Sequence, residues 1–134
     1  MSGALEGLKV IDLTAYLSGP FCAQILGDQG ADVIKVERPD IGDDTRWMPP
    51  FVEGESATFM LWNRNKRSVV LDRKSEEGLD ACRRLIGNAD VVIENFKPGV
   101  AAKLGLGYEA LHEAHPRLIY CSVSGFGQTG PYRT

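Results

Sequence analysis

The chain of 134 residues is long enough for one compact domain, or for one large piece of a bigger domain. Its composition, with 43% hydrophobic and 25% charged residues, is that of a soluble globular protein. The net charge of −3 argues against a protein that coats nucleic acid or an anionic membrane, and no apolar run approaches the roughly 20 residues that span a bilayer, so we expect no nucleic-acid or membrane partner.

The first part of the chain predicts a βαβ unit. A buried strand is expected over residues 8–13, a helix over residues 21–26 that ends at Gly27 or Gly30, and a second strand over residues 31–36. Because two strands joined through one helix in so short a stretch lie parallel, the connection between them should be right-handed.

The next stretch is irregular and then regular alternation resumes. Pro, Gly and acidic residues between positions 40 and 65 predict an excursion with a short helix or turn over residues 58–62. Further strands are expected over residues 68–71, 90–93 and 118–122. Three helices are expected between them: one capped by Ser75, a short one that ends near Leu104, and one over residues 108–114. Strands that alternate with helices predict an α/β fold with a parallel sheet.

Ligands of open parallel sheets gather at the carboxyl ends of the strands. Residues 16–20, 37–46, 72–74 and 94–98 follow the predicted strands and are rich in polar or basic side chains. Arg38 is placed to hold a phosphate through two parallel hydrogen bonds, although its position alone slightly favours a solvated charge or an ion pair with Asp43 or Asp44. The acidic Glu37 suits a ribose hydroxyl, but the loop after the first strand lacks GxGxxG, which disfavours an NAD site.

A basic cluster follows the excursion. Its members are Arg64, Lys66, Arg67, Arg73 and Lys74. It suits an anionic ligand such as coenzyme A (CoA), which carries a diphosphate and a ribose phosphate, and Phe59 and Trp62 are available to flank an adenine. Charge runs are more often solvated and aromatics at this spacing more often belong to a core. A nucleic-acid patch is the rival use, without any recognised nucleic-acid motif to accompany it. Asn95, at the start of a predicted helix, offers either a ligand contact or a helix cap.

No catalytic set can be assembled from these residues. Cys22, Cys82 and Cys121 are odd in number and far apart, which disfavours a disulfide framework or zinc site and suits a cytoplasmic protein. His112 and His115 lie near the end of a short helix without metal-ligand spacing, so a surface role is expected. There is no GxSxG motif, and the glycine-rich residues 125–131 lack the end of a phosphate loop.

Taken in order, the motifs resemble the N-terminal part of the class III CoA-transferase family, also called CaiB/BaiF. The matching segments are LxGLKVIDLT (5–14), SGPFCAQILGDQGADVIKVERP (18–39), GDDTR (42–46), NKRSVVLDRK (65–74), ADVVIENFKPGVAAKLGLGYEAL (89–111) and YCSVSGFGQTGPY (120–132). The similarity covers essentially the whole chain, and several long motifs in one order are more specific than any single motif.

The resemblance implies a Rossmann-like large domain, with helices on both faces of a mostly parallel sheet, whose two chains interlock in a homodimer. It implies transfer of CoA between carboxylic acids, so that acyl-CoA and a carboxylic acid are the substrates, with no metal and no permanently bound cofactor. Residues 1–134 would form the CoA-binding N-terminal portion of the large domain, without the small domain. We accordingly expect a homodimer or association with the remainder of the subunit.

The resemblance also implies CoA-binding residues. They are Leu17, Ser18, Arg38, Leu71, Asp72, Arg73, Lys74, Asn95, Phe96, Lys103, Ser124, Gly125 and Phe126. Leu17 and Ser124 depart from the glutamine and lysine that formyl-CoA transferases carry there, which disfavours a formyl/oxalate substrate pair.

Family transferases use an aspartate that attacks the acyl-CoA, giving a mixed anhydride and then an aspartyl-CoA thioester. The resemblance places this aspartate beyond Thr134, so we expect the chain to contribute CoA binding and to be inactive alone. Two alternatives stay open: a 2-methylacyl-CoA racemase of the same family, and a non-catalytic fragment that binds CoA or a partner chain.

Overall fold

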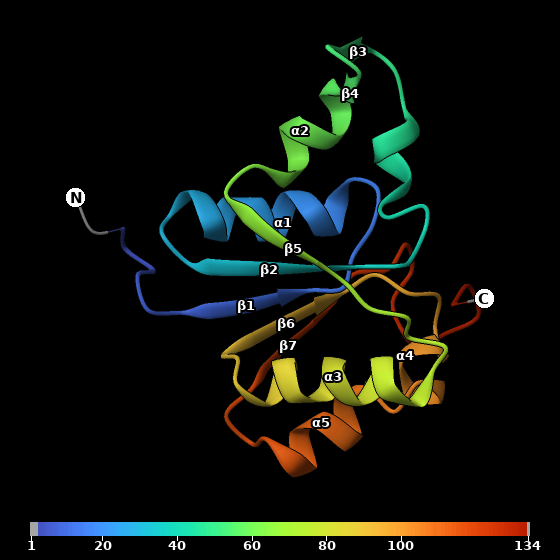
Figure 1. Ribbon diagram of the computed structural model, residues 1–134. Coiled ribbons are helices and arrows are strands. Elements are labelled where there is room, and N and C mark those ends of the chain that lie inside the picture. Colours follow the sequence, from blue (N-terminus) through green and yellow to red (C-terminus); the bar gives the residue numbers. More distant parts are fainter. Residues whose placement is uncertain (1–2, 134) are drawn as a thin grey trace.

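A computed structural model describes residues 3–133. Its centre is a five-stranded sheet of order β5-β2-β1-β6-β7, in which all neighbouring strands are parallel (Figure 1). The strands are β1 (Lys9–Asp12), β2 (Asp32–Glu37), β5 (Lys66–Val70), β6 (Val91–Glu94) and β7 (Ile119–Ser122). The predicted α/β fold with a parallel sheet is confirmed, and most of the strand boundaries are shifted by one or two residues.

The central strand β1 explains why these segments form a sheet. Val10 pairs with Val33 of β2 on one side and with Val91 of β6 on the other. Val10 and Ile11 point to opposite faces and are both buried, as a parallel strand covered on both faces requires.

Helices cover both faces of the sheet, as the resemblance implies. Helices α1 (Ser18–Asp28) and α2 (Ala57–Asn63) lie on one side, and α3 (Glu76–Gly87), α4 (Val100–Lys103) and α5 (Tyr108–Ala114) lie on the other (Figure 1). Each side has its own core. Val10, Ala23 and Val33 belong to the core under α1, whereas Ile11 and Ile86 belong to the core under α3.

The predicted helices differ most from the structure at α1. This helix begins at Ser18, three residues before the predicted start, because Pro20 lies in the first turn, where its missing N–H costs no helical bond. In α3, the predicted cap is confirmed: Ser75 Oγ accepts a hydrogen bond from the Gly78 amide at 3.1 Å. Within residues 3–133, no helix is long and apolar enough to cross a membrane.

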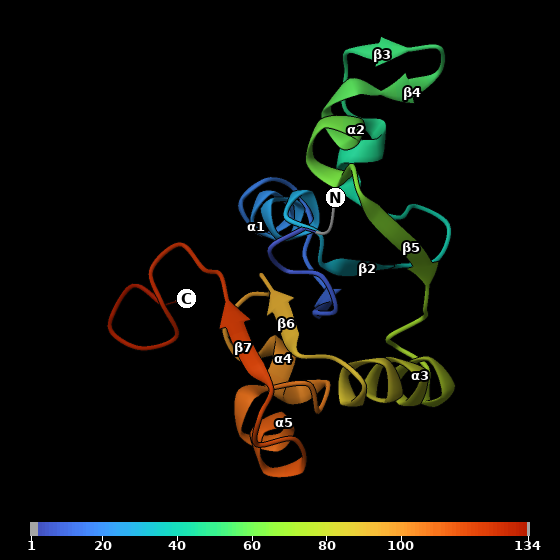
Figure 2. The ribbon, with the colours of Figure 1, turned by 90° about the vertical axis from the view of Figure 1, so that its left-hand side faces the viewer.

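The irregular stretch is an excursion that stands away from the sheet (Figure 2). It contains a 3-10 turn, η1 (Asp44–Trp47), a hairpin of β3 (Phe51–Val52) and β4 (Glu55–Ser56), and then α2. Glu53 and Gly54 both have positive φ angles, so they form the tight two-residue turn of the hairpin.

Candidate functional site

The strand order places a topological switch point between β1 and β6. The chain leaves β1 toward β2 on one side, whereas β6 lies on the other side, so the loops after β1 and β6 diverge. Asn95 bridges the two loops, since its Oδ1 accepts from the Ala15 amide at 3.0 Å and its Nδ2 donates to the Ala15 carbonyl at 2.8 Å. The Asn95 side chain therefore shapes this edge of the sheet.

A cavity of about 220 Å³ opens at the switch point. All four stretches predicted to follow the strands contribute to its lining. The lining residues are Leu13, Thr14, Ala15, Tyr16, Lys35, Val36, Glu37, Arg38, Gly42, Asp43, Asp44, Arg73, Asn95 and Phe96. Among the predicted CoA contacts, the structure brings together Arg38, Arg73, Asn95 and Phe96.

Arg73 is the most distinctive charge of the cavity. Its guanidinium carbon lies 5.2 Å from the centre of the Phe96 ring, and Nη1 donates to the Leu13 carbonyl at 3.4 Å. No carboxylate among residues 3–133 forms an ion pair with it. Burial is the largest influence and lowers the pKa of Arg73, and the nearby charge of Arg38 acts in the same direction. A half-buried cation that lies over an aromatic ring and has no carboxylate partner is well suited to an anionic ligand.

Arg38 follows β2 and forms an ion pair with a nearby aspartate, which was one of the two roles predicted for it. Its partner is Asp44, and Nε donates to the Gly42 carbonyl at 3.0 Å. The Arg38 side chain is 44% exposed and that of Asp44 is 32% exposed. Ion pairs this close to solvent contribute little stability, so a phosphate can compete with Asp44 for the guanidinium.

Lys35 and Asp43, which line the cavity, belong to a buried charge network that the sequence analysis missed. Lys35 is 1% exposed, and its Nζ lies 2.7 Å from Asp43 Oδ2, 3.8 Å from Asp12 Oδ2 and 2.8 Å from the Thr14 carbonyl. Burial is the largest single influence on Asp43 and opposes its ionisation, but the charge and hydrogen bond of Lys35 and the hydrogen bonds from Thr45 together outweigh burial and lower the pKa of this carboxyl. The only sequence signal is a lysine between Ile34 and Val36 in the strand, which faces the same side as Val33.

Lys66 extends the network to the edge strand β5. Its buried Nζ lies 2.8 Å from Asp12 Oδ2, and it donates to the Pro20 carbonyl at 2.8 Å and to Asn63 Oδ1 at 3.0 Å. Burial, the largest influence, lowers the pKa of Lys66, and Asp12 opposes that shift. Lys66 thus joins β1, β5, α1 and α2.

Glu37 ends β2 as a fully engaged carboxylate. Arg46 donates to both of its oxygens at 2.7 Å, Ser68 Oγ donates at 2.5 Å and the Asp43 amide at 2.9 Å. Burial opposes its ionisation, but these hydrogen bonds outweigh burial and lower the pKa of Glu37 to about 2. Glu37 is therefore committed to the loop after β2, and a ribose-binding role of the NAD type is not available to it.

The predicted basic cluster does not assemble around one ligand. Arg64 pairs with Asp28, and Arg67 pairs with Asp32 at the amino end of β2. Of the five basic residues, Arg73 is the one that lines the cavity. The aromatic pair is also engaged elsewhere: the Phe59 ring lies 3.7 Å below the Arg46 guanidinium, and Trp62 packs edge-on against Phe21. Arg64 and Arg67 thus follow the alternative of a solvated charge run, while contact of Arg73 and Lys74 with an anionic ligand stays a prediction.

The remaining predicted contacts lie outside the lining of the cavity. They are Leu17, Ser18, Leu71, Asp72, Lys74, Lys103, Ser124, Gly125 and Phe126. Leu71 packs partly into the core under α3, and Asp72 Oδ1 accepts from the Lys74 amide at 2.9 Å in the turn before α3. Phe126 is 76% exposed beyond β7. Lys103 is the last residue of α4, whereas the other residues of this set lie in the segments that follow β1, β5 and β7. Their contact with CoA stays a prediction.

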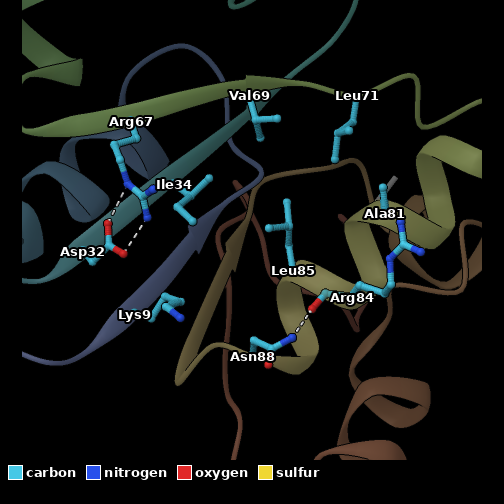
Figure 3. Close-up of a pocket in the computed structure, with 10 residues that line it drawn as sticks. All are labelled: Lys9, Asp32, Ile34, Arg67, Val69, Leu71, Ala81, Arg84, Leu85 and Asn88. Carbon is cyan, nitrogen blue, oxygen red and sulfur yellow. Dashed lines mark hydrogen bonds and ion pairs between the residues drawn. The ribbon is translucent and has the colours of Figure 1, made fainter.

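A larger cavity of about 480 Å³ lies elsewhere, between α3 and strands β2 and β5 (Figure 3). Ile34, Val69 and Leu85 give it an apolar floor. The rim includes Arg67, which points at Asp32 and is neutralised by it. The trough also holds Lys9, but Lys9 and Asp32 are the first residues of β1 and β2, so it opens toward the amino ends of these strands and away from the edge where ligands of parallel sheets gather.

Together, the fold and the site define a doubly wound α/β domain with a polar cavity at its switch point, in which Arg73 has no carboxylate partner among the described residues. The model of CoA-transferase family III matches residues 5–134. The chain belongs to that family, which confirms the resemblance derived from the motifs.

Named relatives and a solved structure agree with this assignment. A succinate–glutarate CoA-transferase of Agrobacterium fabrum is 57% identical over 96% of the chain, which corresponds to 34% of that protein. The human succinyl-CoA:glutarate CoA-transferase is 52% identical over 95% of the chain and 29% of its own length. A CaiB/BaiF family protein from Brucella suis superimposes with a TM-score of 0.93 at 55% identity, over 99% of this chain and 36% of the other. The chain thus spans about a third of the length of these relatives.

Proposed function

We propose that this chain supplies the CoA-binding part of an acyl-CoA:carboxylate CoA-transferase. The observation that carries the proposal is Arg73, a half-buried arginine without a carboxylate partner in a cavity at the switch point. CoA presents a diphosphate and a ribose phosphate, and arginine binds phosphate through paired, charge-assisted hydrogen bonds. The names of the relatives, both CoA-transferases, support the same ligand.

Three residues of the cavity have a defined part in this proposal. Arg73 is held by Phe96 and the Leu13 carbonyl, so its guanidinium is already oriented when a phosphate arrives. Arg38 exchanges its surface ion pair with Asp44 for a second phosphate oxygen. Asn95 keeps the backbone of Ala15 in place and acts through the shape of the loop.

The cavity of about 220 Å³ is smaller than the pockets of about 300–1,000 Å³ that enclose drug-sized ligands, so it would take one phosphate-bearing portion of CoA. The rest of the ligand would lie along the carboxyl edge of the sheet, where the other predicted contacts follow β1, β5, β6 and β7. These contacts are Leu17, Ser18, Leu71, Asp72, Lys74, Lys103, Ser124, Gly125 and Phe126.

The chemistry proposed for the whole subunit follows from the family resemblance. An aspartate in a later segment attacks the acyl carbonyl, expelling CoA as the thiolate and forming a mixed anhydride. The CoA thiolate then attacks the aspartyl carbonyl of the anhydride, which releases the first carboxylate and leaves an aspartyl-CoA thioester. The incoming carboxylate accepts CoA by the reverse steps. Residues 1–134 hold CoA throughout, and the names of the relatives make succinyl-CoA and glutarate the first pair to assay.

Assembly and location complete the proposal. We propose that the chain works in the cytoplasm, which suits its free thiols Cys22, Cys82 and Cys121. It would act within a homodimer or joined to the rest of the subunit, which fits the exposure of Phe21 and Ile25 on α1.

Calorimetric titration of CoA into the chain tests the binding role. We expect Arg73→Gln to weaken CoA binding by about 10- to 100-fold, the usual effect of removing a charged hydrogen-bond donor. The matched control is Arg67→Gln, which removes an exposed arginine at the opposite end of the sheet and should change the affinity less than about twofold. Absence of binding to the unaltered chain, or equal affinities for the unaltered chain and Arg73→Gln, would overturn the proposal.

A further inference from the structure

The loops after β1 and β2, which line the cavity, are joined to each other through the buried side chain of Lys35. Lys35 Nζ donates to the Thr14 carbonyl in the loop after β1 at 2.8 Å, and lies 2.7 Å from Asp43 Oδ2 in the loop after β2. The side chains of both members of this ion pair are at most 2% exposed. The contact thus fixes the separation of the two loops at a point that solvent does not reach.

Asp43 also organises its own loop. Its Oδ1 accepts from the Thr45 amide at 2.9 Å and from Thr45 Oγ1 at 2.7 Å, and it caps the turn η1. Its own amide donates to Glu37 Oε2 at 2.9 Å. Arg38 lies in the same loop and is held there through the Gly42 carbonyl.

The sign of the charge on Asp43 makes this arrangement informative. A carboxylate beside an anion site repels the ligand, so its simple electrostatic effect on a phosphate is unfavourable. Lys35 does not offset this freely, because it also lies 3.8 Å from Asp12, which Lys66 shares. The presence of the buried Asp43 carboxylate at the wall of an anion site is explained if Asp43 serves to hold the loops in place.

We propose that Lys35 and Asp43 are positioning residues of the anion site: their buried ion pair holds the loops after β1 and β2 at the separation that lets Arg38 and Arg73 engage one ligand. This inference rests on the proposed CoA-binding function. It predicts that loss of the Asp43 charge weakens CoA binding. Electrostatics alone would predict the opposite, because removing a negative charge beside an anion site favours the anion.

Two adjacent aspartates provide a matched pair for the test. Asp43→Asn should weaken CoA binding about 10-fold, because the ion pair with Lys35 is lost and the loop after β2 is released. Asp44→Asn should tighten CoA binding by about two- to fivefold, because it frees Arg38 from a surface partner. Thr45→Val, which changes no charge, should weaken binding in the same direction as Asp43→Asn, because it removes a hydrogen bond that holds the Asp43 carboxylate.

Affinities are measured by calorimetry with CoA, at a temperature where circular dichroism shows each variant folded. A merely structural role for Asp43 would lower the melting temperature and leave the affinity of the folded protein unchanged. Unchanged or tighter CoA binding by folded Asp43→Asn overturns the inference. Hydrogen exchange without ligand separates the two proposals: faster exchange at residues 42–46 in Asp43→Asn supports the positioning role even when CoA does not bind, whereas native exchange rates overturn it.

Discussion

Glu37 makes the stability of this protein sensitive to acid. Its pKa is about 2 in the folded protein, against an ordinary value of 4.5, because the hydrogen bonds from Arg46, Ser68 and the Asp43 amide outweigh burial. Since the folded pKa is lowered, the stabilisation is fully present above pH 4.5 and is lost as the pH falls toward 2.

The expected loss from Glu37 is about 3 kcal/mol between pH 6 and pH 2. Denaturant unfolding of the unaltered chain and of Glu37→Gln at several pH values measures it. The variant should be less stable at pH 6 and should lose about 3 kcal/mol less over the same pH range. Parallel stability curves for the two proteins would contradict this origin of the acid sensitivity.

The sequence predicted the residues that follow strand ends, but it grouped cations of β5 that the strand geometry separates. Arg38, Arg73, Asn95 and Phe96 follow strand ends, and the ends of parallel strands converge. Lys66 and Arg67 lie inside β5, where successive side chains point to opposite faces, so adjacent cations in sequence are separated in space. The buried partners of Lys35 were beyond sequence analysis, because they depend on which loop folds over the strand.

The position of Arg73 depends on how the chain enters helix α3. Residues 72–74 turn directly into this helix, and Gly78 in its first turns lies against the Asp72 carbonyl. A Cβ atom at Gly78 would lie 2.0 Å from that backbone oxygen. The close approach of helix and turn therefore requires glycine at this position.

Gly78→Ala should consequently destabilise the protein, although the same change inside an ordinary helix stabilises it by about 1 kcal/mol. The clash should also displace the turn that carries Arg73 and weaken CoA binding. Ser75→Ala is the control, since loss of the cap costs about 1 kcal/mol without a clash. Thermal unfolding and CoA titration of both variants check this, and a stabilised Gly78→Ala would show that helix and turn separate readily.

Most elements were predictable because local signals agreed with the fold. The cap at Ser75 and the helix Tyr108–Ala114 were predicted correctly, since capping residues and apolar spacing are local properties. The hairpin of β3 and β4 was missed because its strands have two residues each and pair only with one another among the described residues. The Glu53-Gly54 turn was its one signal.

For the molecule as a whole, α1 presents an apolar stripe to solvent. Leu17, Phe21 and Ile25 recur every four residues and are 52%, 43% and 40% exposed. Such a stripe favours association with another copy or with the remainder of a subunit, in line with the chain spanning a third of its relatives.

Analytical ultracentrifugation over a range of concentrations tests this association. We expect the unaltered chain to self-associate, and Ile25→Lys to shift the sample toward monomer because it places a charge in the stripe. Arg67→Gln, distant from the stripe, should associate like the unaltered chain. A monomer at every concentration would argue against the α1 face as an interface.

The bond between Asn95 and Ala15 has a consequence for the order of folding. These residues are 80 positions apart, whereas β1, α1, β2 and β5 are close in sequence. Closing the longer loop costs more chain entropy, so the half of the sheet containing β1, β2 and β5 has the kinetic advantage and β6 docks later. The cavity needs both halves and is therefore completed late. A ligand that binds there should therefore lower the unfolding rate more than it raises the folding rate.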